Sequence, residues 1–154
     1  MKVECSVVID QPPSVVFSFI REEENMPLWV SNFERLEYLT KEEDEVGARA
    51  IHHFNENGRS VELEEELTVV DAPNLLEGIM KHELFEVQFT YSLSEIQEDR
   101  TEIKAVIEYT PKSLLFRMYL AFQKQYFLKR HEKDLKRLKE AIEITEDVFP
   151  DDED

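Results

Sequence analysis

The amino-acid sequence predicts one α+β domain, in which an antiparallel sheet of seven strands has one face covered by a long C-terminal helix. Several stretches of residues 33–110 alternate between apolar and polar with almost no helical pattern. Such one-sided alternation is typical of an antiparallel sheet with one covered face. Residues 113–144 follow a helical pattern that no proline or glycine interrupts, and this helix is long enough to be the cover. A length of 154 residues agrees with a single domain.

The N-terminal segment predicts a strand followed by two short helices rather than by a hairpin. The strand is expected at residues 3–9, where alternate positions are apolar. Pro12 and Pro13 end it, and a helix follows at residues 14–20, because proline is tolerated in a first helical turn. A second helical segment is expected at residues 22–30. The helix dipole favours the acids of its first turn, and Trp29, the only tryptophan, lies near its end.

The remaining strands are expected at residues 33–39, on both arms of a hairpin spanning 46–74, and at 75–82, 85–96 and 101–110. The hairpin turn is expected at Asn55–Gly58, where Asn and Gly accommodate a tight turn. Because side chains alternate between the two faces of a strand, one set of hairpin residues is expected to face inward from the sheet. This set comprises Ala48, Ala50, His52, Phe54, Val61, Leu63, Glu65, Leu67 and Val69.

The long helix changes character along its length. Its first half is apolar around much of its circumference, whereas its second half narrows to the stripe Leu135, Leu138 and Ile142. The first half is therefore expected either to be buried more completely or to face something other than a tightly packed sheet. Nine of the 18 basic residues fall between Lys112 and Lys139, and this basic face is expected to meet the acidic sheet.

The charge balance excludes several classes of function. Eighteen basic and 35 acidic residues give a net charge of -17, which argues against nucleic acid and against docking on anionic lipid. Cys5 is the only cysteine, so neither an internal disulfide nor a cysteine-rich metal site is expected. No phosphate-binding glycine loop, dinucleotide fingerprint or metal-ligand spacing occurs, so no cofactor is expected. The N-terminus lacks a long apolar segment, and no run of 18 apolar residues occurs. The sequence therefore predicts a cytoplasmic protein, monomeric or homodimeric, without stable membrane insertion.

Several motifs occur in a telling order along the chain. A proline precedes a short V-x-F helix, and the N-x-P-x-W segment 25–29 follows it; a VG pair begins a strand at Gly47. The stretch "LEEELTVVDAPNLLEG" holds a strand, an Asp-x-Pro turn and a strand, and "KRLKEAIE" comes near the end of the long helix. In these motifs residues 2 to about 144 resemble the START-like (SRPBCC) superfamily, in its polyketide cyclase/dehydrase and lipid-transport branch. The chain departs from that pattern at Arg100, where the family commonly has a glycine before Thr101.

The resemblance implies the helix-grip fold, in which two short helices form a V that supports one end of the long helix. The curved sheet wraps that helix and leaves a cavity between them. The domain would span residues 1–144, and 145–154 would be an acidic, disordered tail. The implied function is binding, or transport, of a small hydrophobic or amphipathic ligand in the cavity. One alternative is a cyclase or dehydratase that uses His and Glu in the cavity. The other is a protein-interaction module like chaperone-activator relatives, with a filled cavity and an exposed apolar patch.

Four polar residues are candidates for chemistry in that cavity. Glu65 is an acid on an apolar face, where it is either the partner of a helix Lys or Arg or a ligand contact. His52 and His53 are adjacent on a strand, so they point to opposite faces and cannot share one metal ion. His82 faces inward if Met80 does. A His52–Glu65 or His82–Glu65 pair would be a plausible acid/base pair.

Aromatic and Met side chains on the strands and the helix are expected either to line the cavity or to fill the core. Tyrosine favours a cavity because its hydroxyl needs a partner when buried, and methionine adapts to irregular ligands. Trp29 is expected to be a packing anchor at the cavity mouth. No catalytic residue is assigned. The expected ligand-binding set is Trp29, His52, Phe54, Glu65, Met80, His82, Phe89, Tyr91, Tyr109, Met118, Phe122 and Tyr126.

Overall fold

The structure, a computed structural model, describes residues 1–42 and 45–148 and confirms the α+β class. The strands are β1 (Lys2–Ile9), β2 (Phe33–Tyr38), β3 (Arg49–Glu56), β4 (Arg59–Asp71), β5 (Leu75–Lys81), β6 (Phe85–Gln97) and β7 (Arg100–Pro111). The helices are α1 (Pro13–Arg21), the 3-10 turn η1 (Glu23–Asn25), α2 (Met26–Trp29) and α3 (Leu114–Val148). All seven strands form one antiparallel sheet in the order β1-β7-β6-β5-β4-β3-β2.

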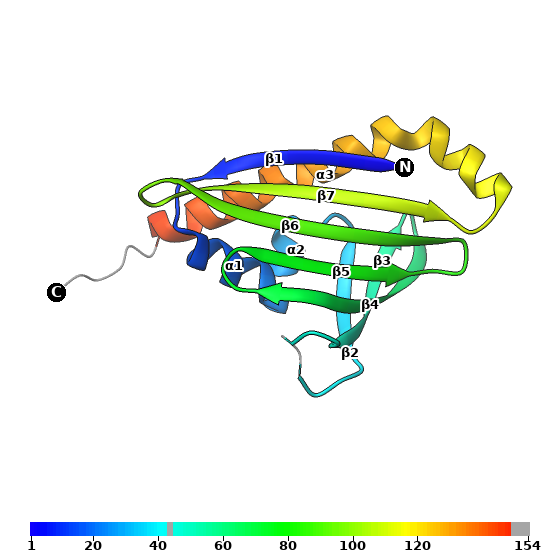
Figure 1. Cartoon of the computed structure of the whole chain (residues 1–154), viewed down its shortest axis with the longest axis horizontal. Helices are drawn as coiled ribbons and strands as arrows, with labels where there is room; N and C mark the ends of the chain where they lie inside the picture. Colours follow the sequence, from blue (N-terminus) through cyan, green and yellow to red (C-terminus); the bar gives the residue numbers. More distant parts are fainter. Residues whose placement is uncertain (43–44, 149–154) are drawn as a thin grey trace.

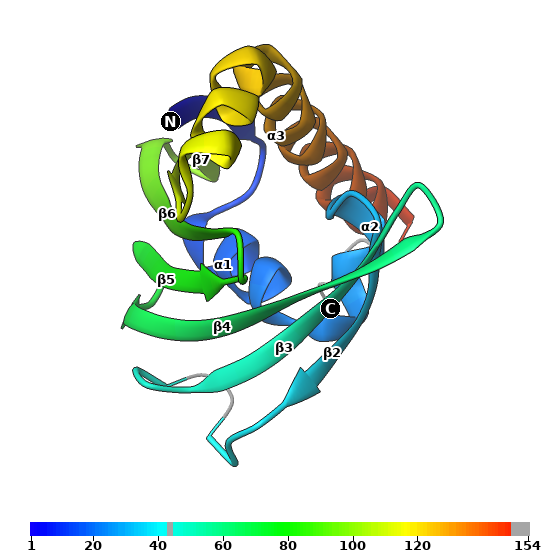
Figure 2. The same ribbon diagram turned by 90° about the vertical axis from the view of Figure 1, so that its right-hand side faces the viewer.

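The sheet curves around the helices (Figure 1). Figure 2 shows β2 and β3 turned away from the direction of β6 and β7, with α1, α2 and α3 on the concave side. The second half of α3 packs against β1, and the stripe expected there is fully buried, with Leu135, Leu138 and Ile142 at most 2% exposed. The predicted helix-grip arrangement is therefore confirmed.

The β3–β4 hairpin turns where the sequence predicts it. Asn57 and Gly58 have φ angles of 55° and 84°, the left-handed values that a two-residue hairpin turn requires. The side-chain oxygen of Asn55 accepts a hydrogen bond of 2.8 Å from the Gly58 N–H. The turn thereby fixes the register that points His52 and Leu63 to the same face.

One expectation for β4 is wrong. The register of β4 against β5 shifts between Leu67 and Val69, so a β-bulge interrupts the alternation. Val70 then lies opposite Leu76 and packs against the core, where Val69 was expected. Simple alternation cannot anticipate the extra residue of a bulge, and the inward faces predicted for the strand before Thr68 are unaffected.

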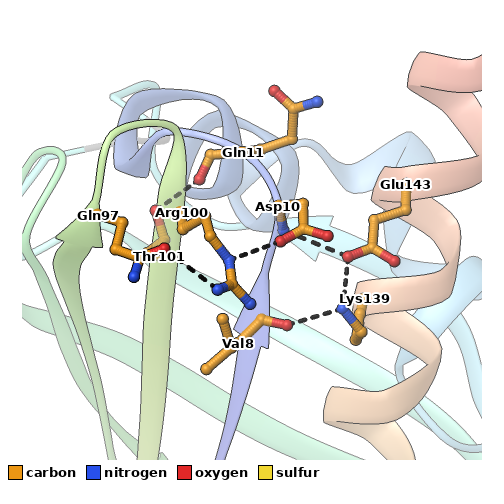
Figure 3. Close-up of polar contacts among 8 residues, drawn as sticks. All are labelled: Val8, Asp10, Gln11, Gln97, Arg100, Thr101, Lys139 and Glu143. Carbon is orange, nitrogen blue, oxygen red and sulfur yellow. Dashed lines mark hydrogen bonds and ion pairs between the residues drawn. The ribbon is translucent and has the colours of Figure 1, made fainter.

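A polar cluster fixes the second half of α3 to the end of the sheet (Figure 3). Lys139 Nζ donates to the Val8 carbonyl over 2.9 Å and also contacts Glu143, whose carboxylate accepts the Asp10 N–H over 3.2 Å. Arg100 Nε donates to the Asp10 carboxylate over 2.8 Å. The cluster joins β1, the β6–β7 hairpin and α3, so the helix is held at this end of the molecule.

The first half of α3 is much less covered. Leu114, Leu115 and Phe122 are 72%, 80% and 85% exposed, so this half faces something other than a tightly packed sheet, the second of the two expectations. The basic face meets the sheet only in part, because the three lysines at positions 129, 133 and 136 are exposed. The helix also continues four residues beyond its expected end at Ile144, and residues 149–154 of the expected tail lie outside the described residues.

Candidate ligand cavity

A cavity of about 690 Å³ lies between the concave face of the sheet, the two short helices and the first half of α3. Its walls are largely apolar, because alternate residues of β3 to β7 point inward and meet one apolar side of the helix. Apolar side chains that contribute to it include Ile20, Met26, Val61, Leu63, Leu76, Phe85, Val87, Ile107, Phe116 and Phe127. A volume of this size is in the range of pockets that hold small molecules.

Most of the expected ligand-binding residues line this cavity. Nine of the twelve do so: Trp29, His52, Phe54, Glu65, Met80, Phe89, Tyr91, Tyr109 and Tyr126. They come from α2, β3, β4, β5, β6, β7 and α3, which are far apart in the sequence. The alternation of each strand identifies its inward residues, but only the closed fold brings them to one cavity.

Three expected residues lie elsewhere. Met118 and Phe122 are 55% and 85% exposed on the outer side of α3 and line a separate surface groove. Because the first half of α3 is apolar on two sides, its sequence does not show which side turns inward; Phe116, Leu120 and Phe127 do. His82 follows β5, where its Nδ1 accepts the Leu84 N–H over 3.1 Å.

His52 and Glu65 form the central polar pair of the cavity. Both are buried, and His52 Nε2 lies 2.9 Å from Glu65 Oε2 across a diagonal of the β3–β4 ladder. The contact is close but poorly aligned, so neither ring nitrogen of His52 has a hydrogen-bond partner among the residues that the structure describes. Buried polar groups are nearly always satisfied, and an exception in a cavity wall marks a place where a ligand or water can bind.

His53 shows that the face of the strand determines which groups a histidine contacts. It is as buried as His52, at 5% exposed, but it lies on the outer side of the sheet. There its two ring nitrogens contact the carboxylates of Glu37 and Glu62 at 3.2 and 3.4 Å. The prediction that the two histidines point to opposite faces is confirmed, and only His52 reaches the cavity.

Trp29 supplies a second unsatisfied donor. Its ring is 5% exposed and packs edge-on against Tyr91, with the ring centroids 6.1 Å apart. The indole Nε1 is buried without a hydrogen-bond partner within the described part of the chain. Burial raises the pKa of Tyr91, with a smaller contribution from the nearby Asp134 carboxylate, so its hydroxyl keeps its proton. Trp29 is thus both a core residue and part of the cavity wall, rather than an anchor at the mouth alone.

A further polar group in the cavity was not anticipated from the sequence. The Tyr109 hydroxyl lies 2.6 Å from His131 Nε2. Burial, reinforced by the Arg130 charge, lowers the pKa of His131 to about 4, so its imidazole is neutral at pH 7. Burial also raises the pKa of Tyr109, so the hydroxyl keeps its proton and shares one hydrogen bond with the neutral imidazole, whose tautomer sets the direction. Tyr109 and His131 satisfy one another, in contrast to His52.

Three elements meet beside this pair through Arg130 on α3. Its guanidinium lies 2.6 Å from Glu56 at the tip of β3 and donates to the Ser31 carbonyl over 3.2 Å. Burial would lower the pKa of Arg130, but the Glu56 carboxylate outweighs it and raises that pKa. Asp134, one turn along α3, accepts hydrogen bonds from the Ser31 N–H and hydroxyl; even so, burial raises the pKa of this carboxyl. These contacts join α3 to the β3–β4 hairpin and to the segment after α2.

The largely apolar cavity, with few polar groups in its wall, therefore suits a small molecule with one polar group.

Among the described residues no group of three or more His, Cys, Asp or Glu side chains could hold a metal ion. No helix in residues 1–42 and 45–148 is long and apolar enough to cross a membrane.

Solved structures of other proteins share this fold. TTHA0849 from Thermus thermophilus is 20% identical with a TM-score of 0.76, over 94% of this chain and 99% of that protein. A START superfamily protein from Mycobacterium smegmatis is 14% identical with a TM-score of 0.70, over 94% and 98%. The di-domain ARO/CYC BexL from the BE-7585A biosynthetic pathway is 14% identical with a TM-score of 0.75; the match covers 94% of this chain and 47% of BexL. At such identities the likeness shows the fold alone.

Sequence comparison gives the family. A search of curated proteins found no match. The family model described as polyketide cyclase / dehydrase and lipid transport, however, matches residues 1–143. With the helix-grip architecture already established, the chain belongs to this START-like (SRPBCC) family.

Proposed function

We propose that this protein binds a small amphipathic molecule in the cavity, with a hydrogen-bonding group of the ligand at His52 and an apolar body along the aromatic wall. The observation that carries the proposal is the unsatisfied edge of an otherwise apolar cavity. His52 Nδ1 and Trp29 Nε1 are buried without a hydrogen-bond partner among the described residues, and His52 Nε2 has only its poorly aligned contact of 2.9 Å with Glu65. A hydrogen-bonding group of the ligand at either residue would remove the free-energy cost of leaving that residue unpaired.

The rest of the ligand would gain affinity from burial. Apolar surface contributes ~25 cal/mol for each Å² removed from water, before the entropy cost of association. Phe54, Phe89 and Met80 are part of the wall that would cover this body. The expected set of ligand contacts is accordingly reduced to the nine residues that line the cavity, with His131 added as a further polar group.

The first test is native mass spectrometry of the purified protein, followed by denaturing extraction and identification of any small molecule that co-purifies. A stoichiometric adduct would support the proposal and name the chemical class. A bare protein that also binds nothing from a mixed library of lipids and aromatic compounds would contradict it.

The two adjacent histidines provide a matched pair of variants for the ligand so found. His52→Gln should weaken binding by about tenfold, because a ligand hydrogen bond contributes about 0.5–1.5 kcal/mol and a misplaced amide adds to its loss. His53→Gln changes an equally buried histidine on the outer face and should leave binding unchanged. Equal effects of both substitutions would show that stability, and not contact with the ligand, is responsible.

A cyclase or dehydratase type of reaction is the second candidate, and one observation favours it. His52–Glu65 and Tyr109–His131 are two acid/base pairs that face the same cavity. The description of the family, polyketide cyclase / dehydrase and lipid transport, suggests polyketide-like compounds as test substrates. Turnover that His52→Ala and Glu65→Gln both abolish, while His82→Ala outside the cavity does not, would support an enzyme. Binding without turnover would leave the protein as a carrier.

The third function expected from the resemblance, a protein-interaction module, predicts a filled cavity and an exposed apolar patch. An exposed apolar patch is present on α3, at Leu115, Met118 and Phe122. The open cavity of about 690 Å³ speaks against that version of it. We retain the cytoplasm as the proposed location and a monomer or homodimer as the proposed state. The strongly acidic charge balance supports the further proposal that nucleic acid is not a partner.

A further inference from the structure

The outer side of α3 carries one continuous exposed stripe whose chemistry changes along the helix. Its members are separated alternately by four and three residues, which places them on one side of an α-helix, and all are exposed. They are Leu115, Tyr119, Phe122 and Tyr126, followed by Lys129, Lys133 and Lys136. Tyr119 and Tyr126 are about half exposed and lie at the edge of the stripe, where they also line the cavity. The stripe is thus apolar and aromatic near the start of the helix and basic towards its middle.

The apolar part is a contiguous surface rather than scattered side chains. Leu115 and Phe122 are 80% and 85% exposed, and Met118 and Leu84 beside them are 55% and 48% exposed. Together with Phe116 and Tyr119 they line a shallow groove of about 500 Å³ on the surface. Single exposed apolar residues are ordinary in proteins, but a contiguous patch marks a surface that meets another apolar phase.

The charge around the stripe differs from that of the rest of the chain. Residues 109–131 contain five basic residues and no acid, in a protein with 35 acids among 154 residues. The three stripe lysines are exposed, and the acids next to them in sequence are Glu132, which is exposed, and Asp134, which is buried. The net charge of -17 opposes docking on an anionic surface for the molecule as a whole. Charges more than about 8–10 Å from a contact are largely screened at physiological salt, so the local basic charge governs how the stripe binds.

The apolar patch also borders the ligand cavity. Phe116 and Tyr119 line both the surface groove and the interior cavity, and their rings lie 5.3 Å apart. Figure 1 shows the first turns of α3 at the end of the molecule opposite the β6–β7 hairpin. A surface that covers the patch would therefore stand next to the cavity wall.

We propose that this stripe docks the protein on the surface of an anionic lipid bilayer. Apolar and aromatic side chains at one end would enter the headgroup region, and the lysines would contact acidic headgroups, as in helices that lie in a membrane interface. A second copy of the chain fits less well, because an antiparallel pair of these stripes would place the lysines of each copy against the apolar half of the other, where they would lose water without gaining an acidic partner. The inference goes beyond ligand binding in the cavity, and either can fail without the other.

Vesicle co-sedimentation tests the proposal with the full chain. The wild type should bind vesicles of phosphatidylcholine containing phosphatidylglycerol, and bind vesicles of phosphatidylcholine alone much less. Leu115→Glu combined with Phe122→Glu should weaken binding by about tenfold or more, because two large apolar side chains are no longer transferred from water into the bilayer. Ile96→Glu, a change of equal chemistry at a residue 47% exposed on β6, should leave binding unchanged.

The basic half of the stripe needs a variant that separates local charge from net charge. Changing Lys129, Lys133 and Lys136 to Glu should weaken binding strongly, at about 1 kcal/mol or fivefold for each basic charge removed. A control triple changes the exposed Lys2, Lys41 and Lys104 to Glu and alters the net charge equally. It should keep most of the binding.

The outcomes decide the proposal. No binding of the wild type, or equal losses in the stripe triple and the control triple, would overturn it. So would a stable dimer that only Leu115→Glu with Phe122→Glu dissociates, because a second copy would then cover the patch. Thermal unfolding of every variant checks that the fold survives. His52→Gln should bind vesicles as the wild type does, so a failure of the proposed cavity function would remain distinguishable.

Discussion

The buried His131 predicts a specific dependence of stability on pH. Burial and the neighbouring Arg130 lower its pKa from an ordinary 6.5 to about 4 in the folded protein. A tenfold change in proton affinity corresponds to about 1.4 kcal/mol. The free energy of unfolding should therefore fall by about 3 kcal/mol through this histidine as the pH goes from above 6.5 to below 4. We choose His131→Gln as the perturbation, because glutamine does not titrate and its amide oxygen can still accept the Tyr109 hydroxyl.

The sign follows from proton binding. Between pH 4 and 6.5 the unfolded chain binds a proton at His131 and the folded protein does not, so stability rises with pH. The stabilisation is complete above pH 6.5 and is lost as the pH falls through 4. Asp134 faces the same region, and its raised pKa acts in the opposite direction, because the folded state then holds the proton more tightly. Asp134 and the other carboxylates contribute in the wild type and in His131→Gln alike, so the difference between the two proteins reports on His131.

Urea unfolding followed by far-UV circular dichroism, at several pH values from 4 to 7, measures the effect. The free energy of unfolding should fall more steeply with decreasing pH in the wild type than in His131→Gln, by up to about 3 kcal/mol in total. Parallel pH profiles would refute the reasoning, since they would mean that His131 titrates equally in the folded and unfolded states.

Three further predictions concern the walls of the cavity and the sheet beside it. Gly78→Ala should cost about 1–3 kcal/mol of stability in urea unfolding, because a Cβ at this position would lie 2.4 Å from the Phe89 ring and force it to move. Glu56→Gln should lower the free energy of unfolding by about 1–3 kcal/mol, since the largely buried Arg130 loses its charged partner. Burial and nearby acids raise the pKa of Cys5 to about 11 from 9.0, so a thiol reagent at pH 8 should modify it about a hundredfold more slowly in the folded protein than in urea.

The strands and the order of elements could be predicted because they depend on local patterns. Alternation in β6 and β7, the Asn57–Gly58 turn and the prolines at the start of α1 are each visible within a few residues of sequence. The prediction from the sequence is wrong at the bulge after Leu67, where one extra residue places Val70 rather than Val69 against the core. A bulge leaves no mark in the apolar pattern of this strand, because both residues are valines.

The polar residues of α3 could not be predicted for a different reason. Arg130, His131 and Asp134 lie where the apolar first half of α3 gives way to the second half with its single apolar stripe. Their partners Glu56, Ser31 and Tyr109 are 22 or more residues away in the sequence. Only the fold brings these groups together. Two observations could have drawn attention to them: His131 is one of only four histidines, and it closes the acid-free stretch.

Two polar positions in the cavity wall differ in a way that predicts how a ligand lies. Tyr109 and His131 are engaged with one another, so a ligand group there would have to displace an existing hydrogen bond of 2.6 Å. His52 Nδ1 has no hydrogen bond to displace, and His52 Nε2 has only its poorly aligned contact of 2.9 Å with Glu65. A single polar group of the ligand should therefore go to β3, and its apolar body should extend towards Phe116 and α3, where the cavity borders the outer patch. In that orientation an amphipathic molecule would leave a bilayer polar end first, which connects the proposed cavity function with the proposed lipid surface.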